Sequence, residues 1–336
     1  MAPPASLPRE RLRSLLDTAA NRRIAVIGDA MLDVYLRGDV ERISPEAPVP
    51  VVRVRDRRYA LGGAGNVAQN VRAVGARCDL VAAIGDDGGG RQLCAMLGAI
   101  GAELDSLVTV DRPTTTKTRV VARSQQVVRV DEEDDEDLDG DEVERLLVAV
   151  RAAIAASDAV VLEDYNKGVL VARVIDAAMH AARDKGVPIV VDPKYRNFFH
   201  YRGATIFKPN RRELEAALGA EVDLEHPEAL PATFARLGVE HLLLTLGEHG
   251  MALISAGGEI ERVPTAAREV YDVVGAGDTV TAYLALVLAA GGSAREAAIV
   301  ANFAAGVEVG KLGAATVSAD EAIDAYDSYM AGPTAG

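Results

Sequence analysis

Short runs of Val, Ile and Leu recur along the chain, and most are separated by stretches in which apolar residues have helical spacing. The clearest apolar runs cover residues 24–27, 80–84, 159–162, 189–191, 205–207 and 242–246. The helix-like stretches cover residues 65–74, 92–97, 142–156, 169–183 and 211–218. Continuous apolar strands that alternate with helices predict an α/β fold, with a mostly parallel sheet covered on both faces. Ligands of such sheets bind beyond the carboxyl ends of the strands.

A second set of strands does not alternate with helices. Residues 49–54, 115–121 and 127–130 have alternating or two-sided strand patterns and predict a small separate sheet that covers the main one as a flap. The sequence shows no internal repeat and no long Pro/Ser linker. We therefore expect a single domain over residues 1–336, with residues 331–336 as a frayed tail.

Composition narrows the class of partners. Of the 336 residues, 49% are hydrophobic and 26% are charged, which is ordinary for a globular protein. The net charge of −14 makes the chain a poor general binder of nucleic acid or anionic membrane. It can still bind an anionic ligand where basic residues are concentrated locally.

The cysteines and the apolar segments indicate a cytoplasmic protein. Cys78 and Cys94 fit neither a disulfide framework nor a metal site, and we expect reduced thiols. The N-terminal residues 1–23 lack the apolar core of a signal peptide. The longest uncharged run, residues 279–294, is shorter than the roughly 20 residues of a membrane span and predicts a buried helix.

One segment is strongly biased, because residues 131–137 are seven consecutive acids. Like charges in a row cannot all converge on one ion, so we expect a solvated, mutually repelling loop rather than a metal or partner site.

The strongest chemical signal is the segment 272–279, Asp-Val-Val-Gly-Ala-Gly-Asp-Thr, which precedes an apolar helical run. Gly-Ala-Gly before a helix leaves backbone N–H groups free to bind an anion, and the helix N-terminus adds positive potential. Such a cradle suits a phosphoryl group in transfer. Asp278 beside it is a candidate general base for an attacking hydroxyl. The simpler alternative is a Gly-rich loop with an Asp N-cap.

A second signal is Leu-Gly-Gly-Ala-Gly-Asn at 61–66, which opens a helix. Paired glycines let the backbone approach a small ligand closely, and Asn66 can hydrogen-bond vicinal hydroxyls. Asp29 and Asp33 follow the first strand, at the end where hydroxyl-rich ligands bind. A tight turn with a cap remains the alternative for 61–66.

A third signal follows the strand at 205–207. Asn210 and Glu213 are spaced i, i+3 on one helix face and could hold a hydrated Mg²⁺ near phosphates. A capping pair at a helix start explains the same spacing.

Basic residues are concentrated between positions 112 and 129, where the sequence has five of them and no acid. In an acidic chain this is a focused positive patch for an anionic substrate, with a solvated strand face as the alternative. Lys167 and Lys194 follow two further strands. The chain has neither a P-loop sequence nor Gly-x-Gly-x-x-Gly after its first strand, which argues against a P-loop NTPase and a Rossmann dehydrogenase.

Taken together, these motifs resemble the ribokinase-like (PfkB-type) carbohydrate kinases, over about residues 23–317. The resemblance implies an ATP-dependent kinase with Asp278 as catalytic base and an anion hole of Gly275, Ala276 and Gly277. The positions it implies for ATP and Mg²⁺ are Lys208, Asn210, Glu213, Thr245, Gly247 and Asn302, with Mg²⁺ held near Asn210 and Glu213 through water. The positions it implies for the substrate are Asp29, Asp33, Gly62, Gly63, Asn66, Lys117, Arg119, Asp164, Lys167 and Lys194. It also implies a lid drawn from about residues 34–58 and 112–131, which often forms a homodimer interface.

Finer motifs resemble one branch of the family, which phosphorylates the C1 hydroxyl of D-glycero-β-D-manno-heptose 7-phosphate. They lie at residues 42–51, 116–119, 124–131, 164–168, 201–205 and 309–313. The implied product is the 1,7-bisphosphate of ADP-heptose and lipopolysaccharide-core synthesis, with a separate nucleotidyltransferase acting downstream. Three alternatives stay open: a kinase of this fold for another sugar or sugar phosphate, a non-catalytic sugar sensor, and a structural partner in a heptose-synthesis complex.

Two positions depart from the family pattern. Val274 stands where many members have Thr, so a monovalent-cation (K⁺) site near Asp272 would depend on backbone carbonyls. Glu163 stands where Ser is commoner, directly before Asp164.

Overall fold

A nine-stranded sheet forms the centre of the molecule in the computed structural model, which describes residues 7–123, 125–226, 230–267 and 269–332. The strands are β1 (Arg23–Gly28), β4 (Arg77–Gly85), β5 (Leu107–Val110), β8 (Ala159–Glu163), β9 (Ile189–Asp192), β10 (Ile206–Phe207), β11 (His241–Thr245), β12 (Met251–Ser255) and β13 (Ile260–Val263). Their order is β13-β12-β11-β10-β9-β8-β1-β4-β5. All neighbours pair in parallel except at one edge, where β12 is antiparallel to both β11 and β13.

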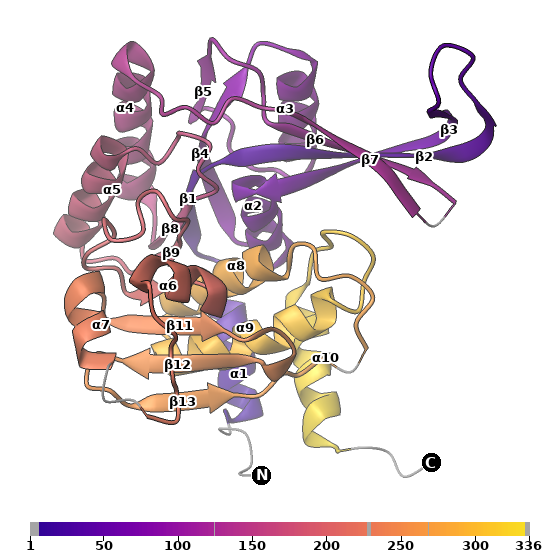
Figure 1. Cartoon of the computed structure of the whole chain (residues 1–336). Helices are drawn as coiled ribbons and strands as arrows, with labels where there is room; N and C mark the ends of the chain where they lie inside the picture. Colours follow the sequence, from indigo (N-terminus) through magenta and orange to yellow (C-terminus); the bar gives the residue numbers. More distant parts are fainter. Residues whose placement is uncertain (1–6, 124, 227–229, 268, 333–336) are drawn as a thin grey trace.

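Helices cover both faces of this sheet (Figure 1). They are α1 (Arg9–Ala19), α2 (Ala64–Ala73), α3 (Gly88–Ala99), α4 (Gly140–Ala156), α5 (Ala172–Lys185), α6 (Arg211–Leu218), α7 (Leu230–Leu237), α8 (Ala276–Ala289), α9 (Ala294–Glu308) and α10 (Ala319–Met330). One apolar core packs α1, α2, α8 and α9 against the sheet, and a second packs α4, α5 and α7 against the other face. The predicted α/β architecture is confirmed.

Helix α8 lies in the middle of the first core, as the long uncharged run predicted. Its side chains are buried around nearly the whole helix, including Tyr283, whose hydroxyl donates to the carbonyl oxygen of Val317 at 2.9 Å. The N-terminus of α8 is thereby fixed relative to the strand ends. Among the described residues, no helix is long and apolar enough to cross a bilayer. Cys78 and Cys94 are both free thiols.

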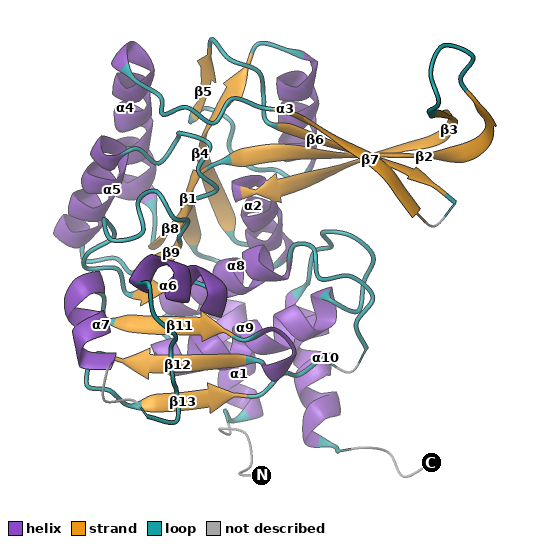
Figure 2. Ribbon diagram, in the orientation of Figure 1, coloured by secondary structure: helices purple, strands orange, loops and turns teal. Residues whose placement is uncertain are grey.

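A four-stranded sheet projects from the body of the molecule (Figure 2). Its order is β3-β2-β6-β7, formed by β2 (Ala30–Ile43), β3 (Pro50–Gly63), β6 (Thr116–Ala122) and β7 (Gln125–Glu132). The small separate sheet that the strand patterns predicted is present, and β2 is a long strand that they did not predict. The root of the β2–β3 hairpin is buried, whereas Ile43, Val54, Val128 and Val130 are exposed farther out. Of the predicted tail, residues 333–336 lie outside the described residues.

Some helix and strand boundaries differ from those that the sequence pattern predicted. The strand predicted at 205–207 has only the two residues of β10, and the helix predicted from 169 begins at Ala172, after Val171 in extended conformation. Helix α3 begins with three glycines and is capped by Asp87, whose carboxylate accepts from the backbone of Gly90 at 2.7 Å. The cap lets three consecutive glycines start a helix that their weak helix propensity disfavours.

Gly28 provides a test of how closely β1 and β8 pack. Its φ is +155°, and a Cβ atom at this position would lie 2.0 Å from the carbonyl oxygen of Glu163. We expect Gly28→Ala to lower the free energy of unfolding by about 3 kcal/mol or more, because the two strands would have to separate. Urea unfolding measures the loss. Gly88→Ala is the matched control, since its Cβ would meet no atom within 4 Å; equal losses in both variants would contradict the prediction.

Candidate active site

The loop before α8 forms a cradle between Asn66 and Lys208. Gly275, the N-cap of α8, has φ +96°, and a Cβ atom there would lie 2.8 Å from the amide nitrogen of Asn66. A Cβ atom on Gly277 would lie 3.6 Å from the Nζ atom of Lys208. The predicted anion hole therefore has a buried ammonium group beside it as well as the positive end of a helix.

Asp278 lies in the first turn of α8 and is almost completely buried. One carboxylate oxygen accepts a hydrogen bond from the amide of Asn66 at 2.7 Å, and the other accepts from the hydroxyl of Tyr165 at 2.8 Å. Burial raises the pKa of Asp278 to about 6, while these two hydrogen bonds oppose the rise by stabilising the ionised form. At neutral pH the group is therefore ionised and able to accept a proton.

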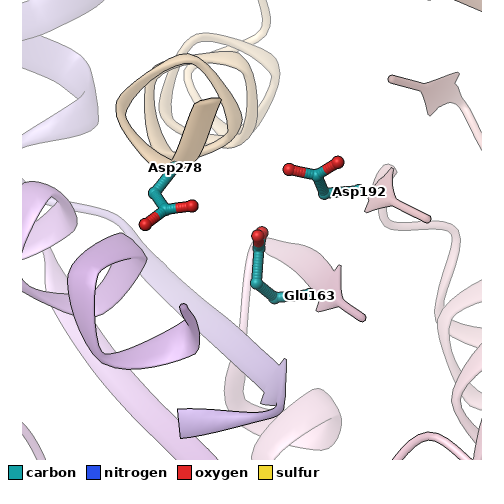
Figure 3. A group of neighbouring side chains, drawn as sticks. All are labelled: Glu163, Asp192 and Asp278. Carbon is teal, nitrogen blue, oxygen red and sulfur yellow. The ribbon is translucent and has the colours of Figure 1, made fainter. Parts of the chain in front are cut away.

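Tyr165 lies in the motif at residues 164–168, but the sequence alone indicated no role for its side chain. Tyr165 follows β8 by two residues, at the carboxyl edge of the sheet where ligands bind. Two carboxylates near Asp278 also lie at this carboxyl edge, because Glu163 ends β8 and Asp192 ends β9. Their place at the ends of predicted strands is the sequence signal that could have identified them. Carboxylate atoms of Glu163, Asp192 and Asp278 lie within 4.8 Å of one another (Figure 3).

Lys208 partly neutralises this group of acids. Its side chain is buried directly after β10, and its Nζ atom donates to Asp192 at 2.7 Å. Burial lowers the pKa of Lys208, but the neighbouring carboxylates, chiefly that of Asp192, outweigh that effect and raise it overall. Lys208 is thus held as an ammonium ion next to the cradle.

A pocket of about 510 Å³ opens on the other side of the cradle. Several residues predicted to contact the nucleotide line it: Asn210, Thr245, Gly247 and Asn302, together with Ala276 and Gly277 of the anion hole. Asn302 is oriented by the hydrogen bond that its amide donates to the carbonyl oxygen of Pro264 at 2.9 Å. The pocket is therefore continuous with the proposed site of phosphoryl transfer.

Asn210 and Glu213 form the capping box of α6, as the structural alternative anticipated. The side-chain oxygen of Asn210 accepts from the backbone of Glu213, and Glu213 accepts from the backbone of Asn210, both at 2.9 Å. The second oxygen of Glu213 accepts from Lys194, whose Nζ lies 5.2 Å from the ring centre of Tyr165. Each oxygen keeps a lone pair for water, so the pair fits a hydrated Mg²⁺ better than direct coordination.

The predicted sugar positions lie where β2 and β3 meet the body. A Cβ atom on Gly62 would lie 2.8 Å from a carboxylate oxygen of Asp33, and one on Gly63 would lie 2.4 Å from the carbonyl oxygen of Asp29. The Asp29 side chain accepts from the backbone amides of Tyr165, Lys167 and Val169, at 2.8, 2.9 and 3.2 Å. It therefore fixes the loop after β8.

Asp164 also helps to fix the loop after β8. Its oxygens accept from the hydroxyl of Tyr201 at 2.6 Å and from the backbone of Asn166 at 2.7 Å. Burial raises the pKa of Asp164 to about 6, and the neighbouring charge of Asp29 adds to the shift.

The basic residues predicted for substrate phosphate are paired with acids. Arg119 binds Asp33. Lys117 and Lys167 bind the two oxygens of Glu133, at 2.6 and 2.7 Å. The expectation of a mutually repelling acidic loop is therefore wrong for Glu133, and also for Asp131 and Asp135, which pair with Arg129 and Arg196. Neighbouring cations compensate these charges.

Asp272 links two loops near the cradle. Its oxygens accept from the backbone amides of Val274 at 3.1 Å and of Gly313 at 3.2 Å. Glu308 is buried nearby, and burial, followed by the charge of Asp272, raises its pKa to about 8. Both oxygens of Asp272 are therefore held by backbone donors, and its carboxylate orders the two loops.

Comparison with known proteins agrees with this geometry. A family model described as "pfkB family carbohydrate kinase" matches residues 21–322. The chain therefore belongs to the pfkB family of carbohydrate kinases and is an ATP-dependent sugar kinase.

Several curated relatives carry the name "Bifunctional protein HldE". Those from Rhodospirillum rubrum and Pelobacter propionicus are each 44% identical to this chain, over 97% and 95% of its length. The one from Caulobacter sp. strain K31 is 48% identical over 92%. The chain spans about two thirds of the length of these relatives: 68%, 66% and 64%, respectively.

Solved structures identify the fold as ribokinase-like. Arabidopsis thaliana ribokinase complexed with ribose and ATP has a TM-score of 0.71 at 22% identity, with 91% of this chain and 98% of that chain covered. The tetrameric inhibited form of phosphofructokinase-2 from Escherichia coli has a TM-score of 0.74 at 18% identity, covering 93% and 99%. At these identities the likeness shows the fold alone, which is the one that the sequence predicted.

The pKa of Asp278 leads to a kinetic prediction. Only the ionised carboxylate accepts a proton, so kcat should fall as the pH drops through about 6. Tyr165→Phe removes a hydrogen bond that stabilises the ionised form, which should raise the pKa and move this acid limb upward by about 0.5–1 pH unit. Profiles of kcat against pH measure the shift.

Tyr201→Phe is the control, because it removes a buried tyrosine hydroxyl that binds Asp164 instead. Its acid limb should stay at the wild-type position. A limb that moves equally in both variants would show that Tyr165 has no particular effect on the base.

Proposed function

We propose that this kinase transfers the γ-phosphoryl group of ATP to the C1 hydroxyl of D-glycero-β-D-manno-heptose 7-phosphate, giving the 1,7-bisphosphate. One observation carries the reaction type: Asp278 lies at the N-terminus of α8, between the nucleotide pocket and the end of β3 at Gly62 and Gly63, with Asn66 beside it. The sequence features of the heptose branch and the HldE-named relatives support the substrate. The pathway is ADP-heptose synthesis in the cytoplasm, where ATP is available.

The chemistry requires little more than positioning and charge compensation. Asp278 accepts the proton of the sugar hydroxyl as its oxygen attacks the γ-phosphorus in line with the departing ADP oxygen. The backbone N–H groups of Gly275 and Gly277 and the ammonium of Lys208 bind the negative charge of the transferring group. The N–H group of Ala276, which donates to the carbonyl oxygen of Val273 at 3.4 Å, would join them by giving up that long hydrogen bond. Mg²⁺ bound through water near Asn210 and Glu213 would neutralise further phosphate charge.

The distal phosphate of the sugar has a matching anion site. Glu133 already bridges Lys117 and Lys167, which shows that the two ammonium groups can bind one anion together. Arg119 holds the carboxylate of Asp33 at the base of the small sheet, and both are set to orient the sugar hydroxyls. In this proposal the substrate phosphate replaces the carboxylate of Glu133 between the two lysines.

The small sheet is proposed to act as a lid on a single kinase domain and as a homodimer interface. Its exposed Val and Ile side chains provide apolar surface, and closure over the site would exclude water that could hydrolyse ATP. A monovalent cation near Asp272 would order the cradle, and a separate nucleotidyltransferase would consume the product.

Release of ADP tests the reaction and the substrate together. We expect turnover with Mg²⁺–ATP and D-glycero-β-D-manno-heptose 7-phosphate, and far less with fructose 6-phosphate or ribose. Asp278→Asn should lower kcat by about 10²–10⁴-fold with little change in ATP affinity, because it removes the base and keeps the shape.

Turnover only with another sugar would retain the mechanism and refute the substrate. Folded, ATP-binding protein that is silent with all three sugars would favour a sensor or a missing partner. Near-normal turnover by Asp278→Asn would exclude Asp278 as the base.

The anion site predicts a selective change in KM. Lys117→Ala and Lys167→Ala should each raise KM for the phosphorylated sugar at least about tenfold, and KM for its unphosphorylated analogue much less, since only the phosphate needs the ammonium pair. Arg173→Ala removes an exposed cation that pairs with Glu144 and is the control. Equal losses with both sugars would place the phosphate elsewhere.

A further inference from the structure

Glu163 is a buried carboxyl group that the reaction described above does not use. It is the last residue of β8, its relative exposure is 0%, and both of its side-chain oxygens lack a hydrogen-bond partner. Among the described residues, Glu308 is the other carboxyl with this property. A buried carboxylate without donors is strongly disfavoured, so the group must either lose its charge or gain a partner.

Three groups next to Glu163 come from neighbouring elements: Asp192 ends β9, Asp278 begins α8, and Lys208 follows β10, with the ammonium already bound to Asp192. Tyr165 and Lys194 also act on Glu163, but the hydroxyl of Tyr165 donates to Asp278 and the ammonium of Lys194 binds Glu213. Figure 3 shows the three carboxyl groups pointing toward one another. If all three were ionised, the cluster would hold three negative charges and one positive charge beside the cradle for the nucleotide phosphates.

A divalent cation would relieve the repulsion, but Lys208 already places a positive charge against Asp192. The negative charge that remains uncompensated is therefore smaller, and a single proton is enough to reduce the repulsion. The position of that proton follows from the surroundings, because Asp278 receives hydrogen bonds from Asn66 and Tyr165 and Asp192 receives one from Lys208, whereas Glu163 receives none.

We propose that Glu163 is a positioning residue that stays a neutral carboxylic acid, donates a hydrogen bond to Asp192, and so leaves Asp278 as the ionised base. Burial raises the pKa of Glu163 well above its ordinary range, and the charges of Asp192 and Asp278 add to the rise, against the opposing effect of Lys208. The proton lowers the net charge of the cluster from −2 to −1, which lets the phosphates of the nucleotide approach.

The role has a signature in the pH profile that a purely structural residue would not give. As the pH rises through the pKa of Glu163, the group ionises, the cluster repels the nucleotide phosphates, and kcat/KM for Mg²⁺–ATP falls about tenfold per pH unit. Glu163→Gln keeps the size and the donor but cannot ionise. Its kcat at neutral pH should stay within about threefold of wild type, without this alkaline limb.

The kinetic signature rests on the proposed function, so the first measurement is independent of activity. Infrared difference spectra of the ligand-free wild-type protein minus Glu163→Gln at neutral pH should show the C=O band of a protonated carboxylic acid. The band should persist when Mg²⁺ is added alone. Absence of the band, or its loss on adding Mg²⁺, would overturn the proposal in favour of an ionised or cation-binding Glu163.

Kinetics with two further variants complete the test. Glu163→Ser also removes the ionisable group, so it too should lack the alkaline limb, and it serves if the Gln variant does not fold. Glu308→Gln removes the other buried unpartnered carboxyl and should retain the limb. An alkaline limb that persists in both Glu163 variants, or that disappears in Glu308→Gln, would refute the role of Glu163. If no sugar is phosphorylated, the infrared band still decides the protonation of Glu163.

Discussion

A single buried charge, the carboxylate of Asp278, sets the requirements for the rest of the site. An ionised group almost out of contact with water needs donors on both oxygens, and it receives them from α2 and from the loop after β8. That loop is itself fixed by Asp29 from the start of the small sheet. Asp278, the loop after β8 and the start of the small sheet are therefore parts of one hydrogen-bonded arrangement.

Three groups at the ends of strands surround the carboxylate of Asp278 and influence its charge. Glu163, Asp192 and Lys208 come from or directly follow three neighbouring parallel strands, whose carboxyl ends meet at one edge of the sheet. The parallel topology forces these groups together in a dry environment, where their interactions are stronger than in water. Burial raises the pKa of Asp278, and the hydrogen bonds from Asn66 and Tyr165 lower it, which together give a value of about 6.

The sequence predicted the α/β architecture because apolar strands and amphipathic helices leave strong periodic signals. It also predicted the anion cradle at the start of α8, because Gly-Ala-Gly at a helix N-terminus can leave backbone N–H groups free to bind an anion. It could not show that Lys117 and Lys167 share Glu133, since the β6–β7 hairpin brings Lys117 near Glu133 but Lys167 comes from the separate loop after β8. The sequence also could not decide whether Asn210 and Glu213 cap a helix or bind a cation, because both roles require the same spacing. Only the folded helix shows the capping geometry. Tyr165, Glu163 and Asp192 were missed because their importance depends on which strand ends become neighbours.

The small sheet has a mechanical property that follows from its shape. Strands β2 and β3 have fourteen residues each, and from a root where Asp33 and Gly62 lie the hairpin extends about 35 Å. A tilt of about 5° around that root moves the tip by about 3 Å, while atoms at the root shift by a small fraction of an ångström. The tip of the sheet therefore lies much farther from the point of rotation than the atoms at the root do. Large movements of the tip become fine adjustments of the root, where we propose that the sugar binds, and a weak force applied at the tip acts there with considerable mechanical advantage.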